Sequence, residues 1–415
     1  MADNKVLHKN QVTENRFRFH QIMFRIAGCP IFRTNESKVV FILSFLCFYI
    51  NFVAILMDIY VNIQDMEHAM ENVRLAFPIA SGLCIHQFMR LRRGAIEQLL
   101  RLTDRFTWNG MLTRDPDTGY LTLAVWIPRI DTSAQKIFAL LVFIHFIYIF
   151  FRSISSDERQ LQFNSWYPFE TLVSPQYELI NATQFIGSIM CLCSFVAFIS
   201  LYATLVCIAC SQLEKLRASL LDIRQNRDIS KDSGAETDQE EIQEVHISQK
   251  MFNHMQKQLN DCIRHHQDIL EFMRALEATM NPMMLAHFLL IAGGMCFATF
   301  SAVTSSGRLL QLAQILIVYI AFATQLYTYC WFGTELTRQA ESLSDAAWRS
   351  DWIGTPVSFQ RCLIFIIATA RRDFVLTAGK FVSVSRETML TIINQTISYF
   401  MFLLNFKDMD TDADQ

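Results

Sequence analysis

The sequence predicts an all-α, polytopic membrane protein with seven transmembrane helices. Of its 415 residues, 52% are apolar and 35 are Phe, whereas only 13 are Gly and 8 are Pro. The apolar residues form long, nearly uncharged runs, which are typical of helices that cross a bilayer. Seven such runs lie near Val39–Val61, Val73–Met89, Ala134–Phe151, Ile180–Cys210, Met283–Val303, Leu309–Phe332 and Thr388–Phe406.

The runs differ in strength and length. The first follows a polar, basic segment, so we expect it to act as an uncleaved insertion signal. The second is the weakest, because it contains Pro78, His86 and Gln87. The fourth and sixth are longer than a bilayer needs, and we expect both helices to continue beyond the membrane on one side.

Lys and Arg in the flanking segments predict the orientation of the chain. Seven basic residues precede the first span, and seven more follow the second span within residues 90–133. The link between these two spans has no Lys or Arg but contains Asp65, Glu67 and Glu71. We therefore expect a cytoplasmic amino terminus and an extracellular carboxy terminus, the inverse of a G-protein-coupled receptor.

The last span has a mostly polar stripe along an otherwise apolar helix. The members of the stripe recur at steps of three and four, which places them on one helix face. Two interpretations are open at this point: hydrogen bonding to a neighbouring helix, or the wall of a water-filled pore. The stripe comprises Thr388, Thr391, Gln395, Ser398, Phe402 and Asn405.

A long, charged segment connects the fourth and fifth spans. Its middle part, Asn226–Gln239, is rich in Asp, Glu, Ser and Gly, and this composition predicts disorder. Apolar residues from Ile247 to Phe272 mostly keep a three-four spacing, so we expect a long amphipathic helix that leads into the fifth span. Such a helix either lies on the membrane surface or packs into a bundle outside the membrane.

The sequence contains no motif for catalysis, a cofactor or a metal. A Gly-rich phosphate loop, an HExxH pair and a GxSxG nucleophile elbow are missing, so we do not expect an enzyme. His265 and His266 lie close to Asp268 and Glu271, but we expect them on a solvated helix rather than at a metal.

Further features bear on other classes of protein. Asn281–Pro282 is similar to the NPxxY motif of rhodopsin-like receptors, but it precedes a span, so we expect Pro282 to begin a helix. The spans lack the paired broken helices and buried charges that a transporter needs. The eleven Cys predict no disulfide framework. With a net charge of −3 and no basic, aromatic-interleaved patch, nucleic-acid binding is not expected.

The last quarter of the chain contains the most specific motifs. They are Tyr329-Cys330-Trp331-Phe332-Gly333, Glu335-Leu336, Asp345-Ala346-Ala347-Trp348, Trp352, Leu376-Thr377-Ala378-Gly379-Lys380-Phe381 and Ser398-Tyr399-Phe400-Met401. Together they resemble the carboxy-terminal signature of insect odorant receptors, and the layout of the whole chain fits that family. The resemblance implies an odorant-gated, non-selective cation channel. In such a channel a variable tuning subunit and a shared coreceptor form a heterotetramer around one central pore.

The resemblance also divides the chain into segments. It implies that Trp331, Trp348 and Trp352 are buried in a helical anchor domain on the cytoplasmic side. The segments are a cytoplasmic amino-terminal part (1–38), the first four spans as the ligand-binding bundle (39–210, with the cytoplasmic loop 90–133), a linker with an anchor helix (211–282), the fifth and sixth spans (283–332), a second anchor segment (333–386), the pore-lining helix (387–407) and an extracellular tail (408–415).

By the same resemblance, the odorant pocket lies in the outer half of the bundle, between the second, third, fourth and sixth spans. An apolar pocket with a few polar groups suits a small volatile ligand. His145 and Tyr148, one helical turn apart, would suit an aromatic odorant. The residues selected for this pocket are Phe77, Ser81, His145, Tyr148, Phe151, Thr183, Gly187, Met190, Gln311, Gln314 and Tyr319.

Alignment of the Tyr399–Met401 motif with the family pattern places the pore constriction at Phe402 and Phe406, with Asn405 at the polar filter position. Gln395 and Ser398 would line the same wall. Apolar rings close a pore by dewetting, while an amide ring coordinates a partly hydrated cation. Four Phe side chains at each level would crowd a tetrameric pore, so we expect a tuning subunit that works only beside the coreceptor.

The expected partners are the coreceptor subunit, a small volatile odorant, membrane lipid and permeant cations. The resemblance implies a multi-pass protein of the plasma membrane in the dendrite of an olfactory sensory neuron. Alternatives are a receptor of the related gustatory type, a G-protein-coupled receptor, and a transporter or membrane enzyme.

Overall fold

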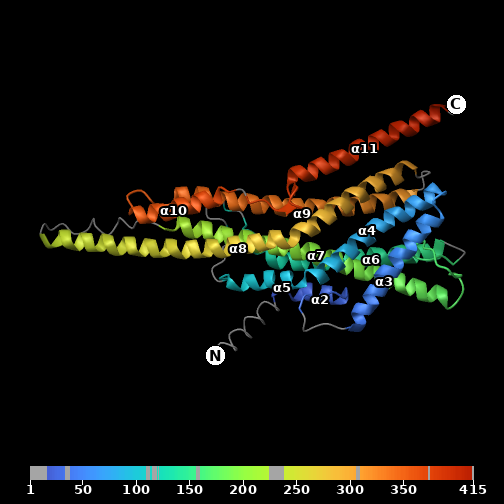
Figure 1. Ribbon diagram of the computed structural model, residues 1–415, viewed down its shortest axis with the longest axis horizontal. Helices are drawn as coiled ribbons and strands as arrows, with labels where there is room; N and C mark the ends of the chain where they lie inside the picture. The colour runs from blue at the N-terminus through green and yellow to red at the C-terminus, as the bar shows by residue number, and fades with distance from the viewer. Residues whose placement is uncertain are drawn as a thin grey trace.

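In the computed structural model, the chain forms an elongated bundle of long helices (Figure 1). The structure describes residues 16–32, 38–108, 113–114, 119, 121–155, 159–223, 238–304, 309–372 and 374–413. The α-helices are α2 (Arg18–Ile26), α3 (Lys38–Val61), α4 (Met66–Leu91), α5 (Arg93–Leu102), α6 (Trp126–Ser155), α7 (Gln176–Leu221), α8 (Asp238–Thr304), α9 (Leu309–Arg349), α10 (Val357–Ala370) and α11 (Arg386–Ala413). Short 3-10 turns, η2 (Thr103–Arg105) and η3 (Leu123–Val125), flank the connection from α5 to α6.

Each of the seven predicted spans falls within one of these helices: α3, α4, α6, α7, α8, α9 and α11. The prediction of an all-α polytopic membrane protein is therefore confirmed. Within the described residues, five of the seven helices contain stretches that are long and apolar enough to cross a membrane by composition alone. The other two are α4, which the neighbouring helices cover, and α11, which carries the polar stripe.

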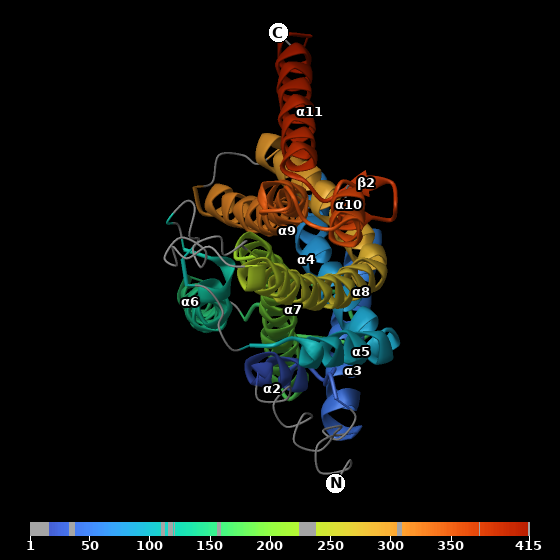
Figure 2. The same cartoon turned by 90° about the vertical axis from the view of Figure 1, so that its left-hand side faces the viewer.

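The helix α7 lies at the centre of the bundle and packs against α2, α3, α4, α6, α8 and α9. Of its most apolar stretch, 83% is buried, because the helix is surrounded along most of its length. The corresponding stretch of α6 is only 6% buried, and its apolar side chains face outward. Figure 2 shows the same arrangement end-on, with α7 among the other helices and α11 standing apart. The exposed apolar face of α6 suits contact with lipid.

The predicted continuation of the fourth and sixth spans is confirmed, because α7 and α9 run on as helices to Leu221 and Arg349. These continuations lie beside the amino-terminal half of α8 and the shorter α10, away from α3 and α6 (Figure 1). We call this four-helix region the distal bundle. The predicted disordered stretch Asn226–Gln239 lies almost entirely outside the described residues.

The fifth span and the amphipathic segment before it form one continuous helix, α8, of 67 residues. The expectation that Pro282 begins a helix is wrong, because Pro282 lies inside α8. The neighbouring Asn281 forms hydrogen bonds through its side chain and its backbone carbonyl. Its Nδ2 donates to the Thr377 carbonyl and hydroxyl at 3.1 and 2.6 Å, and its own carbonyl accepts from the Gly379 N–H at 3.3 Å. These bonds attach α8 to the hairpin that precedes α11.

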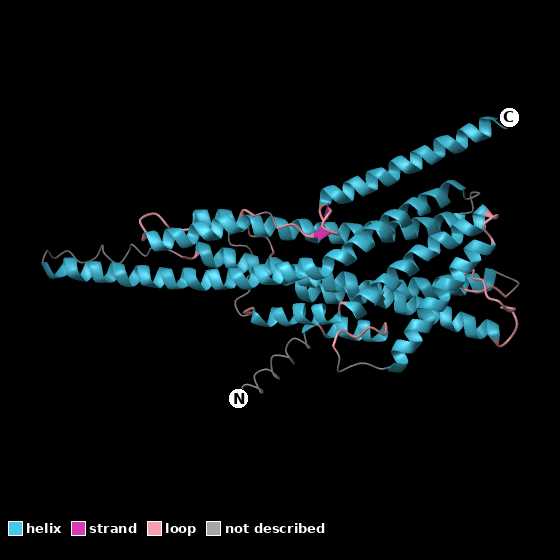
Figure 3. Ribbon diagram, in the orientation of Figure 1, coloured by secondary structure: helices cyan, strands magenta, loops and turns pink. Residues whose placement is uncertain are grey.

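That hairpin consists of β1 (Thr377–Ala378) and β2 (Val382–Ser383), which pair antiparallel, Thr377 with Ser383 and Ala378 with Val382. It lies at the base of α11 (Figure 3). The turn uses Gly379 and Lys380 at φ +64° and +63°, a conformation that glycine adopts at little cost. These strands have only two residues each, and the sequence pattern did not predict them.

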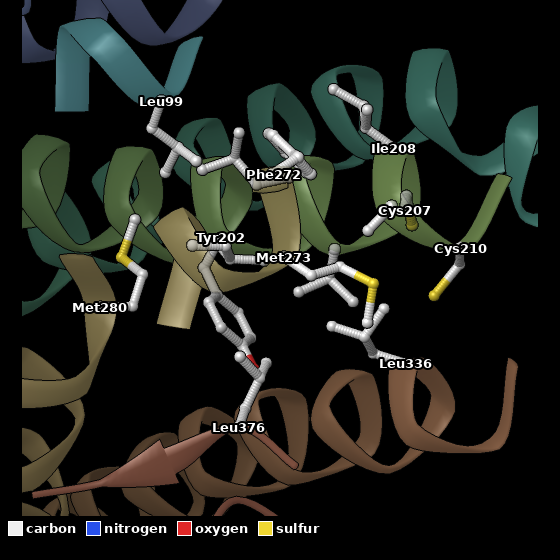
Figure 4. Packing of buried hydrophobic residues seen from close by; sticks show 14 of the residues in the cluster. Leu99, Tyr202, Cys207, Ile208, Cys210, Phe272, Met273, Met280, Leu336 and Leu376 are labelled. Atoms are coloured by element: carbon white, nitrogen blue, oxygen red, sulfur yellow. The ribbon is translucent and has the colours of Figure 1, made fainter. Parts of the chain in front are cut away.

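Apolar side chains from several helices meet in one core that joins the distal bundle to the spans. In Figure 4, Tyr202 on α7 points toward Leu376, just before β1, while Met273 on α8 lies near Leu336 on α9. All four side chains are at most 3% exposed. Burial of this core stabilises the shared position of α7, α8, α9 and the hairpin, since buried apolar area contributes about 25 cal/mol per Å².

Two expectations about this distal region are wrong. Trp348 is 64% exposed, and Trp331 and Trp352 are only half-buried, so the three Trp are not a buried set.

His265 and His266 do not lie on a solvated face. His266 is 5% exposed, and His265 Nε2 lies 2.9 Å from Gln212 Oε1 on α7. These His pack α8 against the bundle. Among the described residues, no cluster of three or more His, Cys, Asp or Glu is arranged to hold a metal.

Candidate functional site

A cavity of about 350 Å³ lies between α3, α4, α6, α7 and α9. This volume is at the lower end of the range of about 300–1,000 Å³ for small-molecule sites. Most of the wall is aromatic or aliphatic, including Phe48, Ile144 and Phe195. The polar contribution comes from a few groups on different helices: Asn51, Glu71, Arg74, His145, Tyr148, Gln184, Ser188 and Gln314. An apolar chamber with a few polar groups can bind and orient a small organic molecule.

The residues predicted for the pocket divide into three groups. His145 and Tyr148 on α6, Gly187 on α7 and Gln314 on α9 line the cavity. Others lie elsewhere within the described part of the bundle, namely Phe77, Ser81, Thr183, Met190 and Tyr319. The side chains of Phe151 and Gln311 lie outside the described residues.

Three of the residues that miss the cavity contact neighbouring helices instead. Phe77 lies against Gly293 and Phe297 of α8, with ring centroids of the two Phe 5.3 Å apart. Met190 packs with Phe48 and Leu83, and the Thr183 carbonyl accepts from Asn51 Nδ2 at 3.1 Å. Helical spacing alone does not distinguish a residue that lines the cavity from its neighbour on an adjacent face of the same helix.

Gly187 allows α3 and α7 to approach closely beside the cavity. A Cβ at this position would lie 3.0 Å from Asn51 Nδ2 and 3.3 Å from the Cys47 carbonyl oxygen. Asn51 Nδ2 in turn donates to the Cys47 carbonyl at 2.6 Å. The glycine therefore sets both the helix contact and the shape of the wall.

His145 is held firmly by its neighbours. Its Nε2 lies 2.8 Å from Ser188 Oγ and 3.0 Å from Gln162 Nε2, and its ring stacks on Phe185 with centroids 5.9 Å apart. With these contacts, the imidazole is a fixed part of the wall. Tyr148, one turn further along α6, lines the same cavity.

Charged side chains also reach into the spans, contrary to the expectation that buried charges are missing. Arg74 on α4 is 4% exposed and lines the cavity. Asp58 on α3 is 7% exposed and accepts from Asn72 Nδ2, with His68 Nε2 at 2.6 Å. Both lie in predicted spans. The sequence did contain the signal, since an ionisable residue within an apolar run is unusual and points to a functional site.

Several residues of the carboxy-terminal signature hold the core together. Tyr329 is fully buried, and its hydroxyl lies 3.0 Å from His287 Nδ1 and 3.1 Å from Gln325 Nε2. Its carbonyl accepts from the Tyr202 hydroxyl at 3.2 Å. Gly333 allows close approach of the chain after β2, because a Cβ there would lie 2.2 Å from the Val384 carbonyl oxygen. The signature therefore specifies how α9 meets the base of α11.

The helix α11 leaves this base and inclines away from the rest of the bundle (Figure 1). At its start, the Thr388 N–H bonds to Ser385 Oγ at 3.3 Å and the Arg386 N–H to Thr334 Oγ1 at 3.0 Å. The helix packs on α8 and α9 through an apolar edge of Met389, Ile392 and Ile393, together with Thr396, which is 1% exposed.

The predicted pore residues lie on the other side of α11. Gln395, Ser398 and Asn405 are exposed, and Phe402 is 63% exposed. The side chain of Phe406 lies outside the described residues. The exposure of Gln395, Ser398 and Asn405 argues against hydrogen bonding of these three residues to a neighbouring helix of the same protomer.

Comparison with known proteins identifies the family. The model of the family described as 7tm Odorant receptor matches residues 65–397, about four fifths of the chain. The chain belongs to the 7tm odorant receptor family. The match covers most of the described helices and every motif of the carboxy-terminal signature up to residue 397.

Curated relatives are similar over part of their length. The chain is 23% identical over 234 residues to "Odorant receptor Or2" of Anopheles gambiae, covering 56% of this chain and 58% of that protein. It is 26% identical over 286 residues to "Putative odorant receptor 85e" of Drosophila melanogaster, covering 62% and 61%. The matched regions thus span about three fifths of these relatives.

Among solved structures, the fold resembles the insect olfactory receptor OR5 from Machilis hrabei, determined in complex with eugenol. The TM-score is 0.69 at 15% identity, covering 96% of this chain and 99% of that one. A second structure of the same receptor gives a TM-score of 0.64. At this identity the likeness shows a shared fold along nearly the whole chain.

Proposed function

We propose that this protein is the odorant-binding subunit of a ligand-gated, non-selective cation channel. A volatile odorant binds in the cavity between α3, α4, α6, α7 and α9, and the last helix, α11, lines a central pore. The working channel is a heterotetramer with the shared coreceptor, in the plasma membrane of olfactory sensory neuron dendrites. Family membership and the eugenol complex of the structurally similar receptor support odorant binding.

The observation that carries the channel proposal is the placement of α11. Its apolar edge packs on α8 and α9, while Gln395, Ser398 and Asn405 are exposed. A polar face in a membrane helix needs a polar neighbour or water. Several protomers around one axis would bring these faces together around an aqueous path.

Gating follows from differential binding. The ligand opens the pore only if it binds the open arrangement more tightly than the closed one. The cavity wall and the pore helix share a neighbour that offers a route for this coupling, because α9 contributes Gln314 to the cavity and also packs against α11.

The test is current recording from cells that express the chain with and without the coreceptor during an odorant screen. We expect odorant-evoked cation currents only with the coreceptor, and a response profile that changes when this subunit is replaced. Currents that need neither odorant nor coreceptor, or no current with any odorant in a chain that reaches the cell surface, would reject the proposal.

A further inference from the structure

One charged residue of the cavity wall, Arg74, has a buried hydrogen-bond donor without an acceptor among the described residues. Arg74 is 4% exposed, and its guanidinium donates through one terminal nitrogen to Gln314 Oε1 at 3.3 Å. Glu71 Oε1 lies 4.0 Å from the same nitrogen. The Nε atom of Arg74 is buried and has no hydrogen-bond partner among the described residues. A buried donor without a partner is costly, and the cost falls when a bound molecule supplies an acceptor.

The other polar groups of the wall are already engaged. Asn51 Nδ2 donates to the Cys47 and Thr183 carbonyls. Gln184 Nε2 donates to the Phe163 carbonyl and to Ser165 Oγ, and its Oε1 accepts from the Phe163 N–H. Among the cavity-lining residues that the structure describes, Arg74 is the only one with a buried side-chain donor left unsatisfied.

We propose that Arg74 receives the carbonyl oxygen of the odorant, so that this receptor selects small ketones, aldehydes and esters. The inference rests on the proposed odorant-binding function and names the ligand class of the same cavity. The hydrocarbon part of the ligand packs against Phe48, Phe195 and Ile317, which lie in the same wall. This arrangement gives one oriented polar contact within an apolar chamber, as small-molecule sites commonly do.

Charge favours a neutral acceptor over a carboxylate. Glu71 lines the same cavity and lies 4.0 Å from the Arg74 guanidinium, so it already supplies a negative charge. A ligand carboxylate would bring a second negative charge beside Glu71 in a site of low dielectric, where like charges repel strongly. A hydrocarbon of the same shape leaves the Arg74 donor unmet.

The first experiment compares matched compounds on the assembled channel of this chain and the coreceptor. The pairs are acetophenone with ethylbenzene, cyclohexanone with methylcyclohexane, and methyl benzoate with propylbenzene; benzoate is the charged probe. We expect the carbonyl member of each active pair to act at a concentration about tenfold or more below its hydrocarbon partner, as fits a hydrogen bond to a charged group. Equal potency within active pairs, or a preference for benzoate, would overturn the inference.

The second experiment changes the donor. Arg74→Met keeps much of the side-chain length but removes every donor, and Arg74→Gln restores one. The control is Arg129→Met, because Arg129 is an exposed residue of α6 away from the cavity. We expect Arg74→Met to abolish the preference for carbonyl compounds, Arg74→Gln to restore part of it, and Arg129→Met to leave it unchanged. Persistence of the full preference in Arg74→Met would refute the role of Arg74.

The outcomes separate this inference from the proposed function. If Arg74→Met fails to reach the cell surface, the comparison of matched pairs on the unaltered channel still decides. Currents without a carbonyl preference reject the role of Arg74 and leave the channel proposal intact. No current from any odorant, with or without the coreceptor, rejects the channel proposal itself.

Discussion

At the scale of single residues, the cavity wall contains both residues that were predicted to line it and a charged residue that was not. The family resemblance places His145 and Tyr148 in the pocket, and both line the cavity. Arg74 was not selected, although it lies on the same wall. Arg74 lies near the start of the predicted span Val73–Met89, and the apolar residues of that run led to its interpretation as a membrane span. Which face of α4 points inward depends on contacts with α3, α7 and α8, which the periodicity of a single helix does not specify.

Substitution of Tyr148 tests the cavity directly. We expect Tyr148→Ala to change which odorants open the channel, because it removes an aromatic part of the wall. The matched control is Phe143→Ala, on the same helix, since Phe143 is 61% exposed and does not line the cavity. The measurement is the relative current across an odorant panel. An unaltered panel in Tyr148→Ala would remove Tyr148 from the binding site.

A second prediction at this scale concerns His266 in the distal bundle. Burial, with His265 and Arg274 nearby, lowers the pKa of His266 from 6.5 to about 4. The folded state therefore binds fewer protons than the unfolded state between these values, and the contribution of His266 to stability is full above pH 6.5 and falls toward pH 4. We expect a loss of about 2 kcal/mol on going from pH 7 to pH 5.

The measurement is thermal unfolding of the purified protein in detergent at both pH values, for the unaltered chain and for His266→Gln. The variant has no imidazole at this position, so its stability should fall by about 2 kcal/mol less between pH 7 and pH 5. An equal fall in both proteins would show that His266 does not contribute to the pH dependence.

At the scale of elements, the connection between α9 and α11 depends on a close approach at Gly333. A Cβ at this position would lie 2.2 Å from the Val384 carbonyl oxygen, which is backbone and cannot swing aside. We expect Gly333→Ala to destabilise the folded chain by about 1–3 kcal/mol, as overpacked core substitutions do. The measurement is the unfolding transition together with the amount of channel at the cell surface.

The control for this substitution is Gly94→Ala in α5. A Cβ at Gly94 meets no atom within 4 Å, and alanine is favoured over glycine within a helix. Gly94→Ala should therefore be neutral or slightly stabilising. If Gly333→Ala is as well tolerated as Gly94→Ala, the close approach does not constrain the base of α11.

The elements also show where sequence reasoning reaches its limit. The helices were predictable, because long apolar runs have few other stable forms in a membrane. The role of Pro282 was not, because the residue lies inside a helix that neighbouring segments stabilise. The bonds from Asn281 to Thr377 and Gly379 connect positions almost a hundred residues apart. The exposure of Trp348 likewise depends on where α10 lies, which helical spacing does not report.

The pore helix gives a further prediction. We expect Asn405→Ala to change the relative permeability of the assembled channel to different cations, because it removes an amide from the proposed filter. The control is Met401→Ala on the same helix, an exposed apolar residue outside the polar stripe, which should leave permeability ratios unchanged. The measurement is the reversal potential with different external cations. Identical ratios in Asn405→Ala and in the unaltered channel would exclude Asn405 from the filter.

At the scale of the whole molecule, the chain has two different outer surfaces. The face of α6 is apolar and suits lipid, whereas the stripe of α11 is polar and projects from the bundle. In a single protomer, Gln395, Ser398 and Asn405 of this stripe are exposed. Assembly with other subunits around a shared axis would place it against water and permeant cations, and the proposed channel depends on that assembly.

The most direct test of this assembly is the accessibility of single cysteines introduced along α11. In channels opened by odorant, a water-soluble, thiol-reactive cation should reach Gln395→Cys, Ser398→Cys and Asn405→Cys and change the current. The same reagent should not affect Ile392→Cys or Ile393→Cys, which lie on the edge packed against α8 and α9. Modification of the packed edge with protection of the stripe would contradict the claim that α11 lines the pore.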